Sequence, residues 1–301
     1  MVKNFDDVIE KVKSGRIRKV AVAVAQDEPV LEAVKAAKEQ GIADAVLVGD
    51  EKAIKEVADK IGMDLSKFEV IHEPNDAKAA LKAVELASKG EADMVMKGLV
   101  ETANFLRAVL NKEVGLRTGK LMSHVAVFEI PNFDRLIFLT DAAFNMYPDL
   151  KAKIDILNNS VKVAHAVGVE LPKVAPVCAV EVVNPDMPAT VDASILSKMN
   201  DRGQIKGCIV DGPLALDNAI SEEAAKHKKV GGPVAGKADI ILLPNIETAN
   251  VMYKTLTYTT NSRNGCILVG TSAPVILTSR ADSFETKLYS IALAALVSAN
   301  K

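Results

Sequence analysis

Short apolar runs alternate with longer mixed runs along the first third of the chain. The apolar runs are rich in Val and Ile, which favour strands, and the longer runs are rich in Ala, Lys, Glu and Leu, which favour helices. The predicted strands cover residues 18–25, 44–50, 67–73 and 92–98, and the predicted helices cover residues 29–40, 76–89 and 103–111, with another helix from Glu51. This alternation is typical of strand–helix–strand units around a parallel sheet.

The pattern changes between residues 121 and 141. Two strand-like runs, 121–130 and 134–141, are separated by only Pro131-Asn132-Phe133. This connection is too short for a crossover helix and therefore predicts an antiparallel hairpin. Beyond it the sequence predicts a helix over residues 149–169 and strands over residues 173–183, 206–209 and 237–245.

The hairpin marks a candidate junction between two α/β domains. With 301 residues, 49% of them hydrophobic, the chain is long and apolar enough for a core in each domain. We predict that residues 1–137 and 266–301 form one domain and that residues 138–265 form the other.

A short polar step interrupts the last apolar segment of the chain. Residues 274–277 predict a strand, Thr278-Ser279-Arg280 follow it, and a helix restarts with Asp282 and Ser283 at its head. Asp282 and Glu285 have the spacing of a capping box, so Asp282 or Ser283 is expected to cap this helix. Loops between a strand and a helix are common anion sites in α/β proteins.

Other polar residues also follow predicted strands. Asp211-Gly212-Pro213 forms a sharp turn after one strand, residues 231–237 form a glycine-flanked loop, and residues 244–250, with Thr248 and Asn250, open a helix. Loops of this kind line the ligand crevice of open α/β sheets. Ordinary turns would look the same in the sequence.

Arg107 lies on a predicted helix among apolar neighbours. An arginine in this setting is commonly a surface side chain whose stem covers apolar residues. Its forked guanidinium is also suited to binding phosphate through two hydrogen bonds, so Arg107 is a candidate phosphate ligand.

Charge and composition narrow the class of protein. The 37 basic and 39 acidic residues nearly cancel, which gives no indication of a nucleic-acid or anionic-membrane partner. No apolar stretch approaches the ~20 residues of a membrane span, and no signal region follows Met1. The cysteines, Cys178, Cys208 and Cys266, form no CxxC pair, so we expect reduced thiols in a cytoplasmic protein.

Common enzyme motifs are missing. Residues 115–121 and 232–238 imitate a phosphate-binding P-loop, but each has three residues between its glycines and neither places Ser or Thr after the Lys. No GxGxxG or GxSxG motif is present. The four histidines are isolated, so no metal site is expected.

Several segments together resemble the phosphate acyltransferase family of phosphotransacetylases and phosphate butyryltransferases, and their form is closest to the phosphate butyryltransferases. These segments are "KGLVETANFLRAVL", "VDGPLALD", "GPVAGKADIILLPNIETANVMYK" and the Ser279-Arg280 step. The resemblance implies a fold like that of isocitrate and isopropylmalate dehydrogenases, with a cleft between two α/β domains, in a homodimer or larger homo-oligomer. It also implies reversible transfer of a short-chain acyl group between CoA and inorganic phosphate in butanoate fermentation, without a metal or prosthetic group.

The resemblance also implies roles for individual residues. Ser279 and Arg280 are expected at the active site and Arg107 on the phosphate side, with Asp211, Gly212, Pro213, Thr248, Asn250 and Ser283 as further phosphate or substrate ligands. Acetyl-transferring relatives carry an acid seven residues after the serine, where this chain has Thr286. Asp282 and Glu285 are therefore the candidates for the catalytic base.

The chemistry of the reaction is consistent with these roles. Because a CoA thiol has a pKa well above 7, its attack on an acyl phosphate is helped by a general base. Negative charge that develops on the carbonyl oxygen and the phosphate calls for fixed donors such as arginines and helix N–H groups. If both substrates are held together, no covalent enzyme intermediate is required, and nothing near Cys208 or Cys266 activates either thiol as an acyl carrier.

Three other functions stay open from the sequence. The chain could be a phosphate acetyltransferase, a metal-dependent dehydrogenase of the same architecture, or a phosphometabolite-binding protein without catalysis. For a dehydrogenase, Asp211 and Asp217 alone make a poor cation site. Phe144, Met146 and Tyr147 are candidates both for the lining of an acyl pocket and for packing at the domain junction.

Overall fold

The structure is a computed structural model that describes residues 2–279 and 281–299. The chain divides into two compact units. One consists of Phe5–Lys120 and Asn264–Lys301 and is called here the flanking unit, while the other, Leu121–Arg263 with a short N-terminal segment, is called the inserted unit. Both strands of the predicted hairpin lie in the inserted unit because they pair with each other, whereas the sequence placed a domain boundary between residues 137 and 138.

The flanking unit is built on a mainly parallel sheet with strand order β3-β2-β1-β4-β11-β10. All neighbours in it are parallel except β10 and β11, which are antiparallel. Its strands are β1 (Arg18–Ala23), β2 (Ala43–Gly49), β3 (Glu69–His72), β4 (Met94–Lys97), β10 (Arg263–Val269) and β11 (Val275–Ile276), and its helices are α1 (Phe5–Lys13), α2 (Glu28–Glu39), α3 (Glu51–Lys60), the 3-10 turn η1 (Leu65–Lys67), α4 (Asp76–Ser88), α5 (Thr102–Val109) and α11 (Phe284–Ala299).

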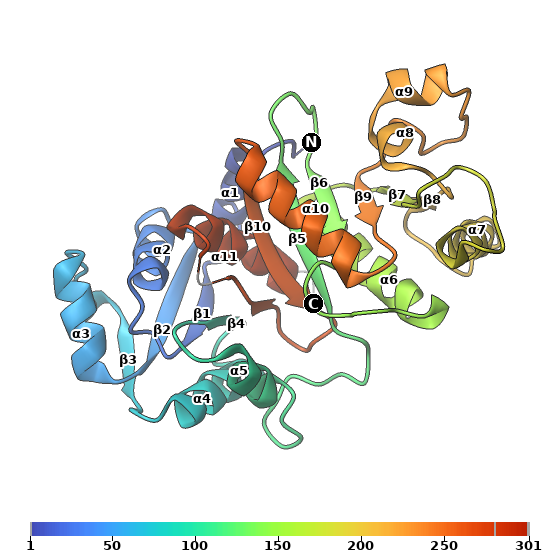
Figure 1. The fold of residues 1–301 in the computed structure, drawn as a ribbon. Coiled ribbons are helices and arrows are strands. Elements are labelled where there is room, and N and C mark those ends of the chain that lie inside the picture. The colour runs from blue at the N-terminus through green and yellow to red at the C-terminus, as the bar shows by residue number, and fades with distance from the viewer. Residues whose placement is uncertain (1, 280, 300–301) are drawn as a thin grey trace. The chain divides into compact units, whose positions relative to one another are not determined.

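Helices cover both faces of this sheet. Figure 1 shows α4 and α5 on one face and α2 and α11 on the other. The central strands β1 and β4 are therefore buried almost throughout, which explains why their sequences are continuous apolar runs rather than alternating ones. Asp27, Asp50 and Asn75 cap the helices that follow three of the strands.

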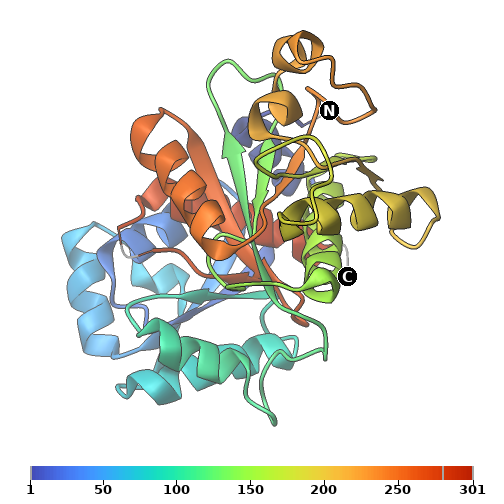
Figure 2. The same cartoon turned by 45° about the vertical axis from the view of Figure 1, so that its right-hand side comes forward.

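The strands of the inserted unit follow one another in the order β5-β6-β9-β7-β8. The hairpin strands β5 and β6 are antiparallel and the other neighbours are parallel. Figure 2 shows α6 and α10 on opposite sides of the hairpin strands. The strands are β5 (Ser123–Glu129), β6 (Ile137–Thr140), β7 (Lys173–Pro176), β8 (Ile209–Val210) and β9 (Ile240–Leu242), and the helices are α6 (Leu150–Val167), α7 (Pro188–Asp201), α8 (Leu216–Ile220), α9 (Glu222–His227) and α10 (Ile246–Thr259).

The predicted strand 173–183 is too long. It ends at Pro176, the last residue that pairs with β9, and the side chains of Val182 and Val183 are 66% and 53% exposed. Helices α7, α8 and α9 were not predicted at all. No helix within the described residues is long and apolar enough to cross a membrane.

Loops of the flanking unit meet at the carboxyl ends of its parallel strands. Strands β1, β4 and β11 are neighbours and run in the same direction, so the loops that follow them lie at one edge. Gly98, just after β4, approaches so closely that an added Cβ would lie 2.2 Å from the Val24 carbonyl oxygen. A side chain there would separate the two loops, which accounts for glycine at this position.

Candidate active site

The polar step between β11 and α11 folds into a closed turn. The Ser279 N–H donates to the Asp282 carboxylate at 2.7 Å, and the Asp282 N–H donates back to the Ser279 carbonyl at 3.2 Å. The Ser279 hydroxyl accepts from the Ala281 N–H at 3.3 Å, and the side chain of Ser279 is exposed. We call residues 279–282 the Ser279 turn. Arg280, predicted to be catalytic, lies outside the described residues.

Ser283, not Asp282, caps α11. Its hydroxyl accepts from the Thr286 N–H at 3.3 Å, as an N-cap residue does. The predicted capping box of Asp282 and Glu285 is wrong, because the Asp282 carboxylate is turned back to the Ser279 N–H. Ser283, which the sequence suggested as a phosphate ligand, thus has a structural role at the helix start.

The acids near this turn differ in accessibility. Asp282 is 9% exposed, whereas Glu285 is exposed on the first turn of α11. The Glu285 carboxylate makes no hydrogen bond or ion pair with any other residue that the structure describes. Thr286, which stands where an acid was expected, is 8% exposed and donates to Asn264 Oδ1 at 3.1 Å. Of the two candidate bases, Glu285 is therefore the one with an accessible carboxylate.

Arg107 belongs to the same unit as the Ser279 turn. It lies on the exposed side of α5, while its neighbours Phe105 and Val109 are fully buried. Its guanidinium donates to Asn104 Oδ1, one helical turn earlier, at 2.7 Å. This geometry leaves most of the guanidinium donors available. It is consistent both with a surface arginine and with a phosphate ligand, the two roles that the sequence suggested.

In the inserted unit, two segments that the sequence singled out separately meet at Asp211. Asp211 directly follows β8 and is half-buried, and burial raises the pKa of its carboxyl. Gly232, in the predicted glycine-flanked loop, has φ +105° and lies so near that an added Cβ would be 2.0 Å from Asp211 Oδ2. The loop thus closes over the carboxylate, while Gly212 and Pro213 carry the chain away from the sheet.

Thr248 and Asn250 are used within the fold. The Thr248 N–H and hydroxyl both donate to Asn245 Oδ1, the N-cap of α10, at 3.0 and 2.7 Å. The Asn250 side-chain amide donates to the Ala142 carbonyl at 3.0 Å. These bonds fix the start of α10 against the loop after β6, so the observed contacts of both residues are structural.

Asp141 is a polar residue at the end of β6 that the sequence reasoning missed. Its buried carboxylate accepts the N–H groups of Ala143 and Phe144, each at 3.0 Å, and of Asn145 at 3.3 Å. These bonds shape the loop that carries Phe144, Met146 and Tyr147, of which Met146 and Tyr147 are 67% and 73% exposed. An aspartate as the last residue of a predicted strand was the available signal.

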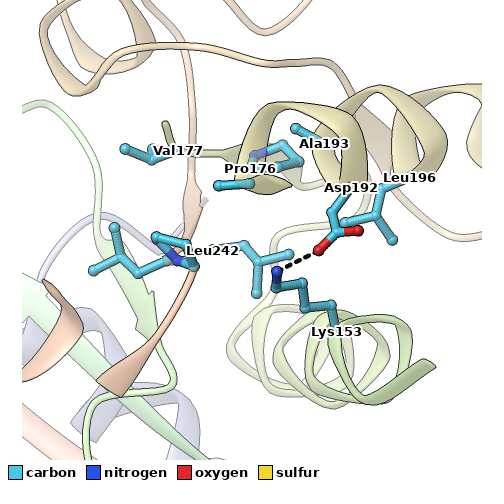
Figure 3. Close-up of a pocket in the computed structure, with 10 residues that line it drawn as sticks. Lys153, Pro176, Val177, Asp192, Ala193, Leu196 and Leu242 are labelled. Carbon is cyan, nitrogen blue, oxygen red and sulfur yellow. Dashed lines mark hydrogen bonds and ion pairs between the residues drawn. The ribbon is translucent and has the colours of Figure 1, made fainter. Parts of the chain in front are cut away.

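A small cavity lies at the carboxyl ends of β7 and β9 (Figure 3). Its volume is about 10 Å³, and its lining includes Pro176, Val177 and Leu242. An ion pair of 2.5 Å between Lys153 and Asp192 closes one side. The space suits about one water molecule and is too small for an acyl chain.

The thiols of Cys178 and Cys208 are poor nucleophiles. Burial raises the pKa of Cys178 and of Cys208 to about 11 in each case. Since only the thiolate reacts, we expect both to be alkylated by iodoacetamide at pH 8 roughly 100-fold more slowly than a free thiol, and Cys178→Ala and Cys208→Ala to keep wild-type turnover. Fast labelling of Cys208, or loss of turnover in Cys208→Ala, would restore the acyl-carrier hypothesis for that thiol, and fast labelling of Cys178 would contradict the effect of burial on it.

No three His, Cys, Asp or Glu side chains gather into a group that could hold a metal ion, as far as the described residues extend. Two sets of the polar residues selected from the sequence instead follow the carboxyl ends of parallel strands, one set in each unit. One set comprises the Ser279 turn, and the other comprises Asp211 with its glycine loop.

Comparison with known proteins gives consistent matches along the whole chain. The family described as "Phosphate acetyl/butaryl transferase" matches residues 4–79 and 67–295. The chain is 75% identical over 301 residues to the phosphate butyryltransferase of Clostridium acetobutylicum, with 100% of both chains covered.

Solved structures agree with this match. The crystal structure of a branched-chain phosphotransacylase from Enterococcus faecalis superposes with a TM-score of 0.83 at 33% identity and covers 94% of this chain and 99% of that one. A 4-hydroxythreonine-4-phosphate dehydrogenase from Klebsiella pneumoniae has a TM-score of 0.51 at 12% identity, with 94% and 100% covered, which shows a shared fold alone. The prediction of an α/β fold of dehydrogenase type is confirmed.

Proposed function

The chain belongs to the phosphate acetyl/butaryl transferase family, and from this premise we propose that it transfers a butyryl group reversibly between CoA and inorganic phosphate. The chain is a phosphate acyltransferase. We choose butyryl because the chain is 75% identical, over the full length of both chains, to a phosphate butyryltransferase. We also propose a place for this reaction in butanoate fermentation.

The exposed Ser279 turn supports a site for acyl transfer on the flanking unit. The Ser279 side chain is exposed, and α11 begins at Phe284, shortly after the turn. We assign Ser279 and Arg280 to the reacting acyl phosphate and Arg107 to its phosphate side. Fixed donors at these positions would stabilise the charge that develops on the carbonyl oxygen and on the leaving phosphate.

We assign the role of general base to Glu285 rather than to Asp282. The accessible carboxylate of Glu285 could take the proton from the CoA thiol as sulfur attacks the acyl carbon. The Asp282 carboxylate is nearly buried and accepts the Ser279 N–H, which supports a structural role. The thiolate then displaces phosphate directly, so no covalent enzyme intermediate, metal or prosthetic group is needed in this proposal.

We place the protein in the cytoplasm as a homodimer or larger homo-oligomer that acts on small molecules. One exposed face of α10 supports self-association. Val251 and Tyr258 lie seven residues apart on one face of this helix and are 66% and 67% exposed, and among the described residues of the helix only Ala249 is buried. Sedimentation of the purified chain as a monomer would contradict the oligomer.

One assay tests the function. Butyryl-CoA is incubated with the wild-type chain, with and without inorganic phosphate and with EDTA throughout, and release of free CoA thiol is followed. We expect phosphate-dependent release that EDTA does not affect. Faster release from acetyl-CoA would favour phosphate acetyltransferase, abolition by EDTA would favour a metal-dependent enzyme, and no release from acetyl- through valeryl-CoA would overturn the proposal.

A further inference from the structure

Lys287 is a buried lysine directly beneath the Ser279 turn. Lys287 lies one turn into α11 and is only 3% exposed. Its ammonium donates to the carbonyl oxygen of Asp282 at 2.6 Å and to that of Ser279 at 3.3 Å. These two carbonyls belong to the first and last residues of the turn, so one side chain ties both ends together.

The surroundings of Lys287 are those of an ion that the fold holds in place. Burial lowers the pKa of the Lys287 ammonium, while the negative charges of Asp282 and Asp27 act in the opposite direction. Asp27 caps α2, a helix that packs against α11, and Asp282 accepts the Ser279 N–H. A buried ammonium is costly unless carbonyls or carboxylates compensate it, and here they come from the turn itself and from the loop after β1.

We propose that Lys287 is a positioning residue for acyl transfer, holding the backbone at Ser279 and Asp282 so that the Ser279 side chain meets the acyl phosphate in a fixed orientation. This inference rests on the proposed function. Lys287 is too deeply buried to touch a substrate, and its hydrogen bonds end on the turn's backbone. Preorganised donors are effective because they need no rearrangement as charge develops, and the ammonium supplies that rigidity.

Two variants separate positioning from general stability. Lys287→Met keeps most of the length and the apolar character of the side-chain stem but loses all three N–H donors. Leu293→Ala removes a fully buried side chain of the same helix, away from the turn, and destabilises without touching it. We expect Lys287→Met to lower kcat by ~30-fold per folded molecule, less than the full loss of one transition-state donor. Leu293→Ala should lower Tm but keep kcat per folded molecule.

A double-mutant cycle with Ser279→Ala gives the decisive readout. If Lys287 acts through the turn, Lys287→Met should lower kcat by less than ~3-fold when the Ser279 hydroxyl is already absent, because coupled residues are not additive. Lys287→Arg, which keeps charged N–H donors, should recover part of the lost kcat. Equal fold-losses in both backgrounds, or unchanged kcat in Lys287→Met, would overturn the inference.

Hydrogen exchange tests the same inference without an activity assay. The N–H groups of Ser279 and Asp282 should exchange at least ~10-fold faster in Lys287→Met than in the wild type, and unchanged exchange would overturn the inference. If Lys287→Met does not fold, Lys287→Gln, which keeps a shorter N–H donor, is measured instead with the same expectation. A wild-type chain that is inactive with phosphate would contradict the proposed function and leave this measurement to decide on Lys287.

Discussion

Replacing Arg280 by alanine is expected to lower phosphate-dependent release of CoA from butyryl-CoA by at least ~100-fold, the scale of losing one transition-state donor. The guanidinium is assigned to the negative charge that develops on the reacting acyl phosphate. In the turn around this position, the Ser279 side chain is exposed, and the Ala281 N–H donates to the Ser279 hydroxyl. The measurement is kcat with saturating butyryl-CoA and phosphate.

Arg202→Ala is the matched control for this variant. Arg202 is exposed and is the C-cap residue of α7. Because the chain runs from α7 to the amino end of β8, whereas Asp211 follows the carboxyl end of β8, Arg202 and Asp211 lie at opposite ends of this strand. Arg202→Ala should keep wild-type turnover. Arg280→Lys should fall between the wild type and Arg280→Ala, because lysine keeps the charge but loses the fork. Full activity in Arg280→Ala would move the site away from this turn.

The parallel sheet of the flanking unit could be predicted because local preference and burial agree along it. Strands β1, β2 and β4 are apolar runs, and the helices between them carry enough Ala, Lys and Glu to be recognised. The short connection Pro131-Asn132-Phe133 was likewise enough to predict the antiparallel pair of β5 and β6, which the structure confirms.

Residues 177–227 show where the sequence pattern was insufficient. Helix α7 buries only Thr190, Ala193 and Leu196 among its described residues, so its apolar face is too narrow to stand out. Helices α8 and α9 have five and six residues, too short for a periodic pattern to develop. Val182 and Val183 imitate a strand by composition, although neither is buried against the sheet.

The sequence singled out the segments of the candidate site but not the contacts within them. These segments stood out because polar residues follow apolar strands, as at Ser279 and Asp211. The contacts of Asp282 and Lys287 could not be predicted, because both depend on backbone groups that come together only when the turn closes. Sequence spacing alone favoured Asp282 as a cap, whereas the turn draws its carboxylate back to Ser279.

Glu285→Gln is expected to lower the rate of CoA attack on butyryl phosphate by ~100-fold or more at pH 7, the range found when a general base is lost. Gln is close to Glu in shape but cannot accept the thiol proton. Because the Glu285 side chain is exposed and makes no hydrogen bond or ion pair with other described residues, the fold should tolerate the change. The measurement is kcat/KM for CoA, with Tm as a check of folding.

Asp282→Asn separates the two acids at this site. The side-chain amide oxygen that this substitution introduces would still accept the Ser279 N–H, so the turn should persist. The rate should fall by less than ~10-fold, because one charge is lost but the base is kept.

The pH profile of Glu285→Gln adds a second criterion. Free thiolate becomes more abundant as pH rises towards the thiol pKa, so the deficit of Glu285→Gln should shrink between about pH 6 and pH 9, roughly in proportion to the thiolate fraction. A deficit independent of pH, or a larger loss in Asp282→Asn than in Glu285→Gln, would transfer the role of base away from Glu285.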